Sequence, residues 1–151
     1  MPWIVVMTKP NHEAIAASNL QRQLFNYYYP RFLLKKPNKK PQIKPLFPRY
    51  VFVHIEQLWR SLAGTRGVSC LLMGAEGPRT VNDQIIADLQ SREDKFGYYQ
   101  LLLPELNSFK IGQKVKAETG PLAGHLLIYQ GMLPKDRVAC LFEAMGRQSR
   151  V

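Results

Sequence analysis

The sequence is poor in the residues that build metal sites and disulfide frameworks. Its 151 residues include two cysteines, Cys70 and Cys140, and three histidines, His12, His54 and His125. The cysteines lie in apolar surroundings without CxxC spacing, which excludes a zinc site made from cysteine alone and favours two buried, reduced thiols. The histidines are scattered and form no ligand pattern, so we expect no bound metal.

Long apolar runs are also missing. The apolar segment Trp3–Met7 has no preceding positive cluster and is far too short for a secretory signal. No run approaches the roughly 18 residues that a membrane helix needs. We therefore expect a cytoplasmic protein with no membrane partner.

Acidic residues are scarce. Eleven Asp and Glu stand against 21 Lys and Arg, which gives a net charge of +10. No Asp or Glu occurs between residues 31 and 49, where the positive residues are Arg31, Lys35, Lys36, Lys39, Lys40, Lys44 and Arg49. Such a segment cannot neutralise itself and should attract a polyanion. The alternative is a solvated basic surface that only keeps the protein soluble.

No constellation of catalytic residues stands out. The sequence has no nucleophile–base pattern and no paired carboxylates in a motif. The loop Gly64–Gly67 has neither the GK[ST] ending of a phosphate-binding loop nor Rossmann spacing. We expect neither an enzyme nor a cofactor.

The first part of the chain has the pattern of an α+β domain. Trp3–Met7 predicts a buried strand, and a helix capped by Asn11 should follow, with Ala16, Leu20 and Leu24 on its apolar face. Residues 27–29 and 32–34 predict a second strand, whose hairpin partner is the segment 49–55. Further along we expect a short helical turn over 58–63, a strand over 68–73, and a helix capped by Asn82 that ends near residue 95. The pattern predicts an antiparallel sheet with flanking helices over residues 1–95.

The second part is less regular. Residues 96–108 contain Gly97 and Pro104 and predict a linker, although leucines 101–103 could dock on the first domain. Residues 109–151 place glycines between short apolar segments, as a small β-barrel does. Segments 126–129 and 138–142 can be barrel strands around a turn at 133–136, or they can form a helical hairpin. We favour the barrel, because its glycines weaken helices and 138–142 is strand-like.

Four motifs occur in a fixed order: Trp3–Val6, Leu20–Gln23, Pro45–Val53 and Thr65–Val68. In order and spacing they resemble the NusG family of transcription elongation factors, and within it the RfaH-type specialised paralogs. Residues 112–115, followed by 120–124, resemble the start of a KOW domain. The resemblance covers almost the whole chain and implies an NGN domain over 1–95, a linker over 96–108 and a KOW domain over 109–151.

The resemblance implies a factor that suppresses pausing or termination by binding the clamp helices of RNA polymerase. The positions that match the polymerase-binding face are Met7, Phe47, Tyr50 and Phe52. Large aromatic side chains are typical anchors of interfaces. The alternative is that these rings fill the core of the sheet. Strand alternation predicts that Phe47 and Tyr50 do not both point the same way as Phe52, so that one ring is structural.

The resemblance also implies contact with the non-template DNA strand of the transcription bubble. The matching positions are Lys9, Asn19, Arg22, Gln23 and Arg66. Arg22 and Gln23 lie on the polar face of the first helix, and Arg66 lies on a glycine-flanked loop where its guanidinium could stack on a base. The alternative for Arg22 and Arg66 is solvated surface charge.

The lysines of the basic segment have no family counterpart. From their charge alone, we expect Lys35, Lys36, Lys39, Lys40 and Lys44 to bind phosphates of upstream duplex DNA or nascent RNA. The alternative is a flexible tip.

The chain departs from its relatives at two places. Leu58–Ser61 replaces the His-Thr-Thr turn that reaches the polymerase gate loop in RfaH-like proteins, so that contact is missing or is made by Trp59 and Arg60. The region after Gly124 also differs, and some relatives switch it from a barrel to a helical hairpin that masks the clamp-binding face until DNA releases it.

Several partners follow from the resemblance. The KOW domain of relatives recruits ribosomal protein uS10 or the termination factor Rho. The short chain, its charge and the departures in its second part favour an operon-specific paralog that acts as a monomer. A ribosome-associated KOW protein that binds RNA is the alternative function.

Overall fold

The structure is a computed structural model that describes residues 3–35, 37–54, 59–75, 77–101, 126 and 128–148. Its strands and helices, in chain order, are β1 (Trp3–Thr8), α1 (Glu13–Arg22), β2 (Asn26–Tyr28), β3 (Arg31–Leu34), β4 (Gln42–Pro45), β5 (Tyr50–His54), the 3-10 helix η1 (Trp59–Gly64), β6 (Val68–Leu71), β7 (Met73–Gly74), β8 (Gly77–Pro78), β9 (Thr80–Val81), α2 (Asp83–Ser91) and α3 (Pro134–Gln148).

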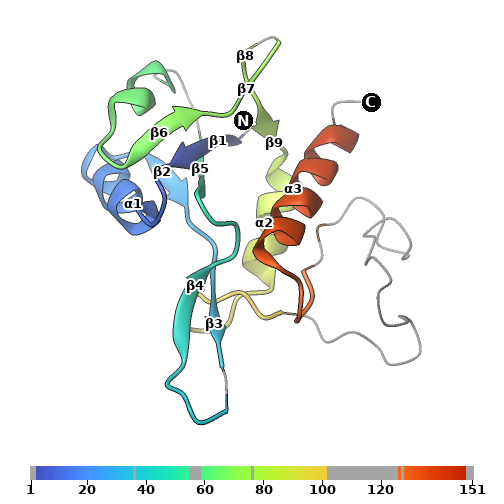
Figure 1. Cartoon of the computed structure of the whole chain (residues 1–151). Coiled ribbons are helices and arrows are strands. Elements are labelled where there is room, and N and C mark those ends of the chain that lie inside the picture. The colour runs from blue at the N-terminus through green and yellow to red at the C-terminus, as the bar shows by residue number, and fades with distance from the viewer. Residues whose placement is uncertain are drawn as a thin grey trace.

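The central sheet is antiparallel and has the order β2-β5-β1-β6, with β9 paired to β1 (Figure 1). Strand β1 lies between β5 and β6, and its register pairs Val5 with Phe52 and Val6 with Leu71. A strand covered on both faces needs apolar residues at successive positions, which explains the unbroken run at the start of the chain. The predicted α+β class, with an antiparallel sheet and helices, is confirmed.

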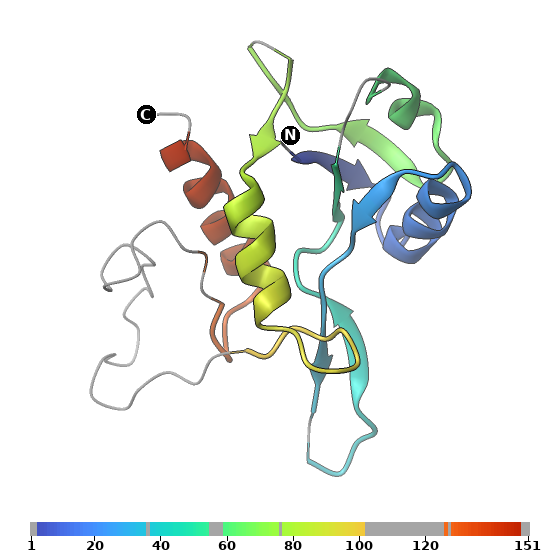
Figure 2. The same cartoon turned by 180° about the vertical axis from the view of Figure 1, so that it is seen from behind.

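The two faces of the sheet carry different cores. Ile4 and Val6 point to the face packed with Ala16 and Leu20 of α1, whereas Val5 points to the opposite face. That opposite face packs with α2 and α3, which lie side by side in both views (Figures 1 and 2). The alternation of side chains along β1 thus divides the helices between the two faces.

The second predicted strand is in fact two strands. β2 pairs with β5, as expected, but β3 pairs with β4, which the sequence pattern did not indicate. Pro30 lies between β2 and β3 and has no N–H to donate to a ladder, so the pairing changes partner there. The β3–β4 hairpin projects from the sheet and carries the basic segment (Figure 1).

Helix α1 begins one residue later than a cap at Asn11 would place it. Asn11 has a φ of 61° and lies in the preceding turn, while the N-cap position is His12, which makes no side-chain cap bond. Ala16 and Leu20 are buried as predicted, but Leu24 lies beyond the helix with a φ of 65° and is 92% exposed. The prediction that Leu24 lies on the apolar face of the helix was wrong, because α1 ends at Arg22 and does not reach it.

The cap at Asn82 is confirmed, since its side chain accepts a hydrogen bond from the Gln84 N–H at 2.8 Å. Helix α2 ends at Ser91 and not near residue 95. The chain turns back there, because Gln100 N donates to Arg92 O at 2.9 Å and closes a loop. The described part of the expected linker is packed: Tyr99 is buried, and Leu101 contacts the same core.

The strand predicted over 138–142 was wrong, because these residues lie in α3. The turn predicted over 133–136 is the start of that helix, where Arg137 N donates to Leu133 O at 3.1 Å. Pro134 suits the first turn of a helix, and burial of residues 137, 141, 144 and 145 follows helical spacing. Residues 102–125 and 127, which hold most of the predicted barrel, lie outside the described residues. Within 128–148 the structure contains no barrel strand.

Candidate functional site

The four residues matched to a polymerase-binding face come from two adjacent strands and the turn before one of them. β1 and β5 pair Met7 with Tyr50. Phe47 and Phe52 are fully buried with ring centroids 6.0 Å apart at 89°, and Tyr50 packs partly buried against the same cluster.

The expectation that one of the three rings points away was wrong. Strand alternation does not reach Phe47, because β5 begins only at Tyr50. Phe47 lies in the preceding turn, where Tyr50 N donates to Phe47 O at 3.1 Å and Arg49 has a φ of 74°. That turn brings the Phe47 ring to the side on which Phe52 points.

Helix α3 packs on this aromatic face. Leu141, Ala144 and Met145 belong to the hydrophobic cluster that contains Phe47 and Phe52. At the border of the contact, Phe142 meets the Tyr50 ring edge-on, with centroids 5.5 Å apart. The rings of Phe47 and Phe52 therefore belong to the hydrophobic core, and α3 covers the face of the sheet on which they lie.

Arg137 attaches α3 to the turn that carries Phe47. Its Nε donates to Leu46 O at 2.7 Å, its Nη1 donates to Met132 O at 2.9 Å, and its guanidinium lies 4.9 Å from the centre of the Phe32 ring. The side chain is only 6% exposed, and burial lowers the pKa of Arg137. The sequence signal that would have predicted the burial of Arg137 is its helical spacing from the apolar residues 141, 144 and 145.

A second link joins the chain before α3 to the loop that follows α2. Ile128 N donates to the hydroxyl oxygen of Tyr99 at 3.2 Å, and both residues are buried. Burial raises the pKa of the Tyr99 hydroxyl, although this hydrogen bond lowers it.

The residues matched to DNA contacts gather around the loop that follows η1. Asn19 Nδ2 donates to Arg66 O at 3.2 Å, and Gln23 Nε2 donates to the hydroxyl of Thr65 at 3.2 Å. Lys9 N donates to Gly67 O at 2.9 Å. The structure thus brings Lys9, Asn19, Gln23 and Arg66 together.

The residues matched to DNA contacts have side chains of two kinds. The amides of Asn19 and Gln23 hold the loop in place, whereas the side chains of Lys9, Arg22 and Arg66 are exposed. Arg22 lies in the last turn of α1, beside Gln23. Three cations on a fixed scaffold can contact phosphates or bases without first being ordered.

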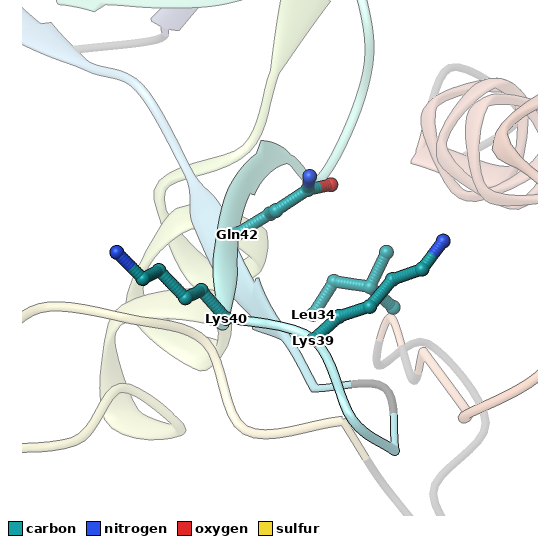
Figure 3. Close-up of a pocket in the computed structure, with 4 residues that line it drawn as sticks. All are labelled: Leu34, Lys39, Lys40 and Gln42. Atoms are coloured by element: carbon teal, nitrogen blue, oxygen red, sulfur yellow. The ribbon is translucent and has the colours of Figure 1, made fainter.

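The basic hairpin is a separate surface. Lys35, Lys39, Lys40 and Lys44 are exposed, whereas Lys36 lies outside the described residues. A shallow cleft near the tip is lined by Leu34, Lys39, Lys40 and Gln42 (Figure 3). Lys40 points to one side of the hairpin and the other three lining residues point to the opposite side (Figure 3).

The expectation of two buried thiols was wrong. Cys70 is exposed and Cys140 is partly exposed, and both are free. Strand β6 is an edge strand of the central sheet, so residues on it stay in contact with water. The Cys70 sulfur lies 3.8 Å from that of Met7. In the described ranges, no group of three or more His, Cys, Asp or Glu side chains could hold a metal ion. Nor does any described helix combine the length and apolar character required to cross a membrane.

Comparison with known proteins gives one family. A family model described as transcription termination factor NusG matches residues 1–90, which hold the whole central sheet, α1 and nearly all of α2. The curated proteins that were compared give no match. Since the matched residues are more than half of the 151, and the antiparallel sheet and helices agree with the resemblance of the motifs, the chain belongs to the NusG family.

Proposed function

We propose that this protein is an elongation or antitermination factor that binds the clamp helices of RNA polymerase and suppresses pausing or termination. Its docking face would be Met7, Phe47, Tyr50 and Phe52. The observation that carries the proposal is the apolar cover on this face: Phe142 of α3 meets the Tyr50 ring edge-on, and Leu141, Ala144 and Met145 share the cluster of Phe47 and Phe52. Apolar side chains that meet a helix in one state can meet another helix in a second state.

The face is masked in the structure described above, so binding requires that α3 moves. Phe47 and Phe52 have no exposed surface, whereas Met7 and Tyr50 are partly exposed at the border. Polymerase would first contact these two side chains and then replace α3. A helix on this face supports the helical, autoinhibited alternative for the second part of the chain, and with it an RfaH-like paralog over a general factor.

DNA would provide the releasing signal. Lys9, Arg22 and Arg66, with Asn19 and Gln23, would contact the non-template strand. The helix α1, which carries two of them, packs on the face of the sheet opposite to α3 (Figure 1). DNA can therefore bind while α3 is still in place, which is the order of events that operon-specific recruitment needs.

The remaining partners are proposed from the resemblance. The KOW region, once released from the aromatic face, would recruit ribosomal protein uS10 or Rho. The lysines of the β3–β4 hairpin would add phosphate contacts that carry no sequence information. The protein would act as a monomer in the cytoplasm, with Trp59 and Arg60 replacing the gate-loop contact if there is one.

Tyr50→Ala tests the docking face. Phe47→Ala is a poorer choice, because removing a fully buried ring costs about 3–5 kcal/mol of stability. Tyr50 is partly exposed, and truncating an interface anchor costs about 2 kcal/mol or more, or roughly 30-fold in affinity. The control is Tyr27→Ala, a partly buried ring that packs on the other face of the sheet. The measurement is affinity for core polymerase by surface plasmon resonance.

Equal affinity of the Tyr50 variant and the wild type would contradict the docking face. Co-purification with ribosomal subunits, without binding to polymerase, would favour the ribosome-associated alternative instead. Operon specificity is tested by transcription in vitro through a pause or a Rho-dependent terminator, on templates with and without a candidate leader. Activity on every template would indicate a general factor.

A further inference from the structure

The loop after α2 holds an aromatic side chain in water. The loop is fixed by Asp94, whose Oδ1 accepts hydrogen bonds from Phe96 N at 2.8 Å and Tyr98 N at 3.0 Å. Gly97 has a φ of 86° and Gly97 N donates to Asp94 O, so the turn is tight. Phe96 is nevertheless 70% exposed, with the Lys95 ammonium 5.1 Å from its ring centre.

An arginine between two tyrosines continues this surface. The Arg31 guanidinium lies 5.3 Å from the centre of the Tyr29 ring and 5.8 Å from that of Tyr98. Its Nε is buried and has no hydrogen-bond partner among the described residues. Tyr99 N donates to Arg31 O at 2.8 Å, which attaches the loop to the start of β3. Figure 2 shows the loop crossing the base of the β3–β4 hairpin.

The surface that holds Arg31 and Phe96 lies on the side of the β3–β4 hairpin that α3 does not cover. Phe32 points toward Arg137 of α3, so Arg31 and Leu33, its neighbours in β3, point the opposite way. Near the tip, Lys40 points away from Leu34, which shares the side of Phe32 (Figure 3). A strip that starts at the loop and ends at Lys40 is therefore accessible whether or not α3 is docked.

Two carboxylates lie near one end of this strip, because Glu93 interacts electrostatically with Arg31 and Glu13 with Tyr29. Glu93 accepts a hydrogen bond from the buried Tyr28 hydroxyl, and Asp94 uses its Oδ1 inside the loop and its Oδ2 for Gln100 Nε2 at 3.0 Å. The strip thus combines the exposed ring of Phe96 and the half-buried rings of Tyr29 and Tyr98 with lysine and arginine. Rings that stack bases beside cations that bind phosphates are the features that recognise unpaired nucleic acid.

We propose that the strip formed by Tyr29, Arg31, Lys40, Lys95, Phe96 and Tyr98 binds single-stranded RNA. A duplex does not fit, because its bases are stacked and paired and cannot reach Phe96. The choice of RNA rests on the proposed function: the non-template strand is assigned to Lys9, Arg22 and Arg66, so the transcript is the unpaired strand left for this strip. The strip extends the phosphate contacts of the hairpin with contacts to bases.

The first experiment uses the free full-length protein and a labelled, unstructured RNA of about 12 nucleotides, a length within the usual site sizes. Fluorescence anisotropy should show that Phe96→Ala weakens binding about 5- to 100-fold, which corresponds to the loss of one stacked base. Phe96→Tyr should keep the affinity. Leu133→Ala, which removes an exposed apolar side chain beside α3, is the matched control and should change nothing.

Charge is tested in the same assay. Lys40→Ala and Lys95→Ala should each make the slope of log affinity against log salt shallower by about 0.7, the value for one phosphate of a single strand. Lys135→Ala, an exposed lysine on α3, should leave the slope unchanged. Unchanged affinity for Phe96→Ala, or loss of affinity only for the lysine variants, would overturn the stacking strip.

The second experiment identifies the strand in an assembled polymerase complex with a photo-crosslinking p-benzoylphenylalanine at position 96. Crosslinks to the labelled transcript support the proposal. Crosslinks to either DNA strand, or to a polymerase subunit only, overturn it. If the protein fails to join the complex, the proposed function fails, while the anisotropy of the free protein still decides whether the strip binds RNA.

Discussion

The Arg137 guanidinium and the Leu46 carbonyl oxygen form a 2.7 Å hydrogen bond across 91 positions of the chain. This bond connects α3 to the turn that positions Phe47, so the cover and the covered face share a polar contact as well as an apolar one. Hydrogen bonds to charged groups contribute about 1.5–3 kcal/mol, more than a neutral pair. The release of α3 should depend on this contact.

Arg137→Met should loosen α3. The variant keeps an apolar side chain in the helix but leaves the buried carbonyl of Leu46 without this donor, which costs about 1–3 kcal/mol. Hydrogen exchange of the α3 amides should accelerate about 5- to 100-fold, which corresponds to that range of free energy. If α3 masks the docking face, affinity for polymerase should rise in the same variant. Lys135→Met, at an exposed position of α3, is the control. Unchanged exchange in the Arg137 variant would show that the apolar contacts alone hold the helix.

Gly67→Ala should destabilise the fold. Gly67 has a φ of 94°, and a Cβ there would lie 2.8 Å from Ala16 N, which is backbone and cannot move aside easily. Residues held in such a backbone conformation cost about 1–3 kcal/mol, and the clash with α1 adds to this. Urea unfolding should show the loss as a lower midpoint.

The control is Gly64→Ala in the same segment, where no atom lies within 4 Å of the added Cβ and φ is not positive. That variant should stay within about 0.5 kcal/mol of the wild type. Equal midpoints for the two alanine variants would contradict the close approach of Gly67 to α1.

Asn82→Ala should weaken helix α2. The Asn82 side chain accepts from Gln84 N, and loss of an N-cap acceptor costs about 1 kcal/mol. Because α2 carries Ile85, Ile86 and Leu89 into the core, the whole domain should lose this stability in thermal unfolding. Ser18→Ala, at an exposed position in α1, is the control and should be neutral or stabilising. A loss in the Ser18 variant as large as that in the Asn82 variant would rule out a specific cap.

Glu93 should make stability depend on pH. Burial raises the pKa of Glu93 above its ordinary 4.5, despite the hydrogen bond from Tyr28, which lowers it. The folded state therefore binds this proton more tightly than the unfolded state. The stabilisation from the protonated form is fully present below the unfolded pKa and is lost as pH rises through the folded pKa.

Glu93→Gln removes this titration and keeps an acceptor for Tyr28. The difference in unfolding free energy between the variant and the wild type should grow in favour of the variant as pH rises from 4.5. Urea titrations of both proteins at several pH values measure it. A constant difference across that window would show that Glu93 titrates alike in both states.

Much of the first domain could be predicted from local patterns. The apolar run of β1, the cap at Asn82 and the burial of Ala16 and Leu20 depend on neighbouring residues and followed the expectation. The predictions failed where a contact between residues distant in the sequence determines the local structure. Leu24 continues the apolar spacing of α1, but the helix ends before it, and β4 forms only because β3 is beside it.

In the candidate sites, too, the sequence showed the local features but not those that depend on distant contacts. The motifs identified Phe47, Tyr50 and Phe52, yet their order along the chain could not show that all three rings lie together, because the turn at Arg49 interrupts strand alternation. The partners of Asn19 and Gln23 are 47 and 42 positions away, so their role in holding the Thr65–Arg66 loop was not visible. The Tyr29–Arg31–Tyr98 stack was missed for the same reason.

The sequence by itself determined the family, the antiparallel sheet and the two kinds of surface, aromatic and basic, because motifs, periodicity and charge are local properties. Only the tertiary structure decided the form of residues 134–148. Their apolar residues fit a strand or a helix, and intrinsic preference differs between the two by about 1 kcal/mol or less per residue. Burial of Leu141, Ala144 and Met145 against the aromatic face, with Arg137 bonded to Leu46, outweighs that small preference and selects the helix.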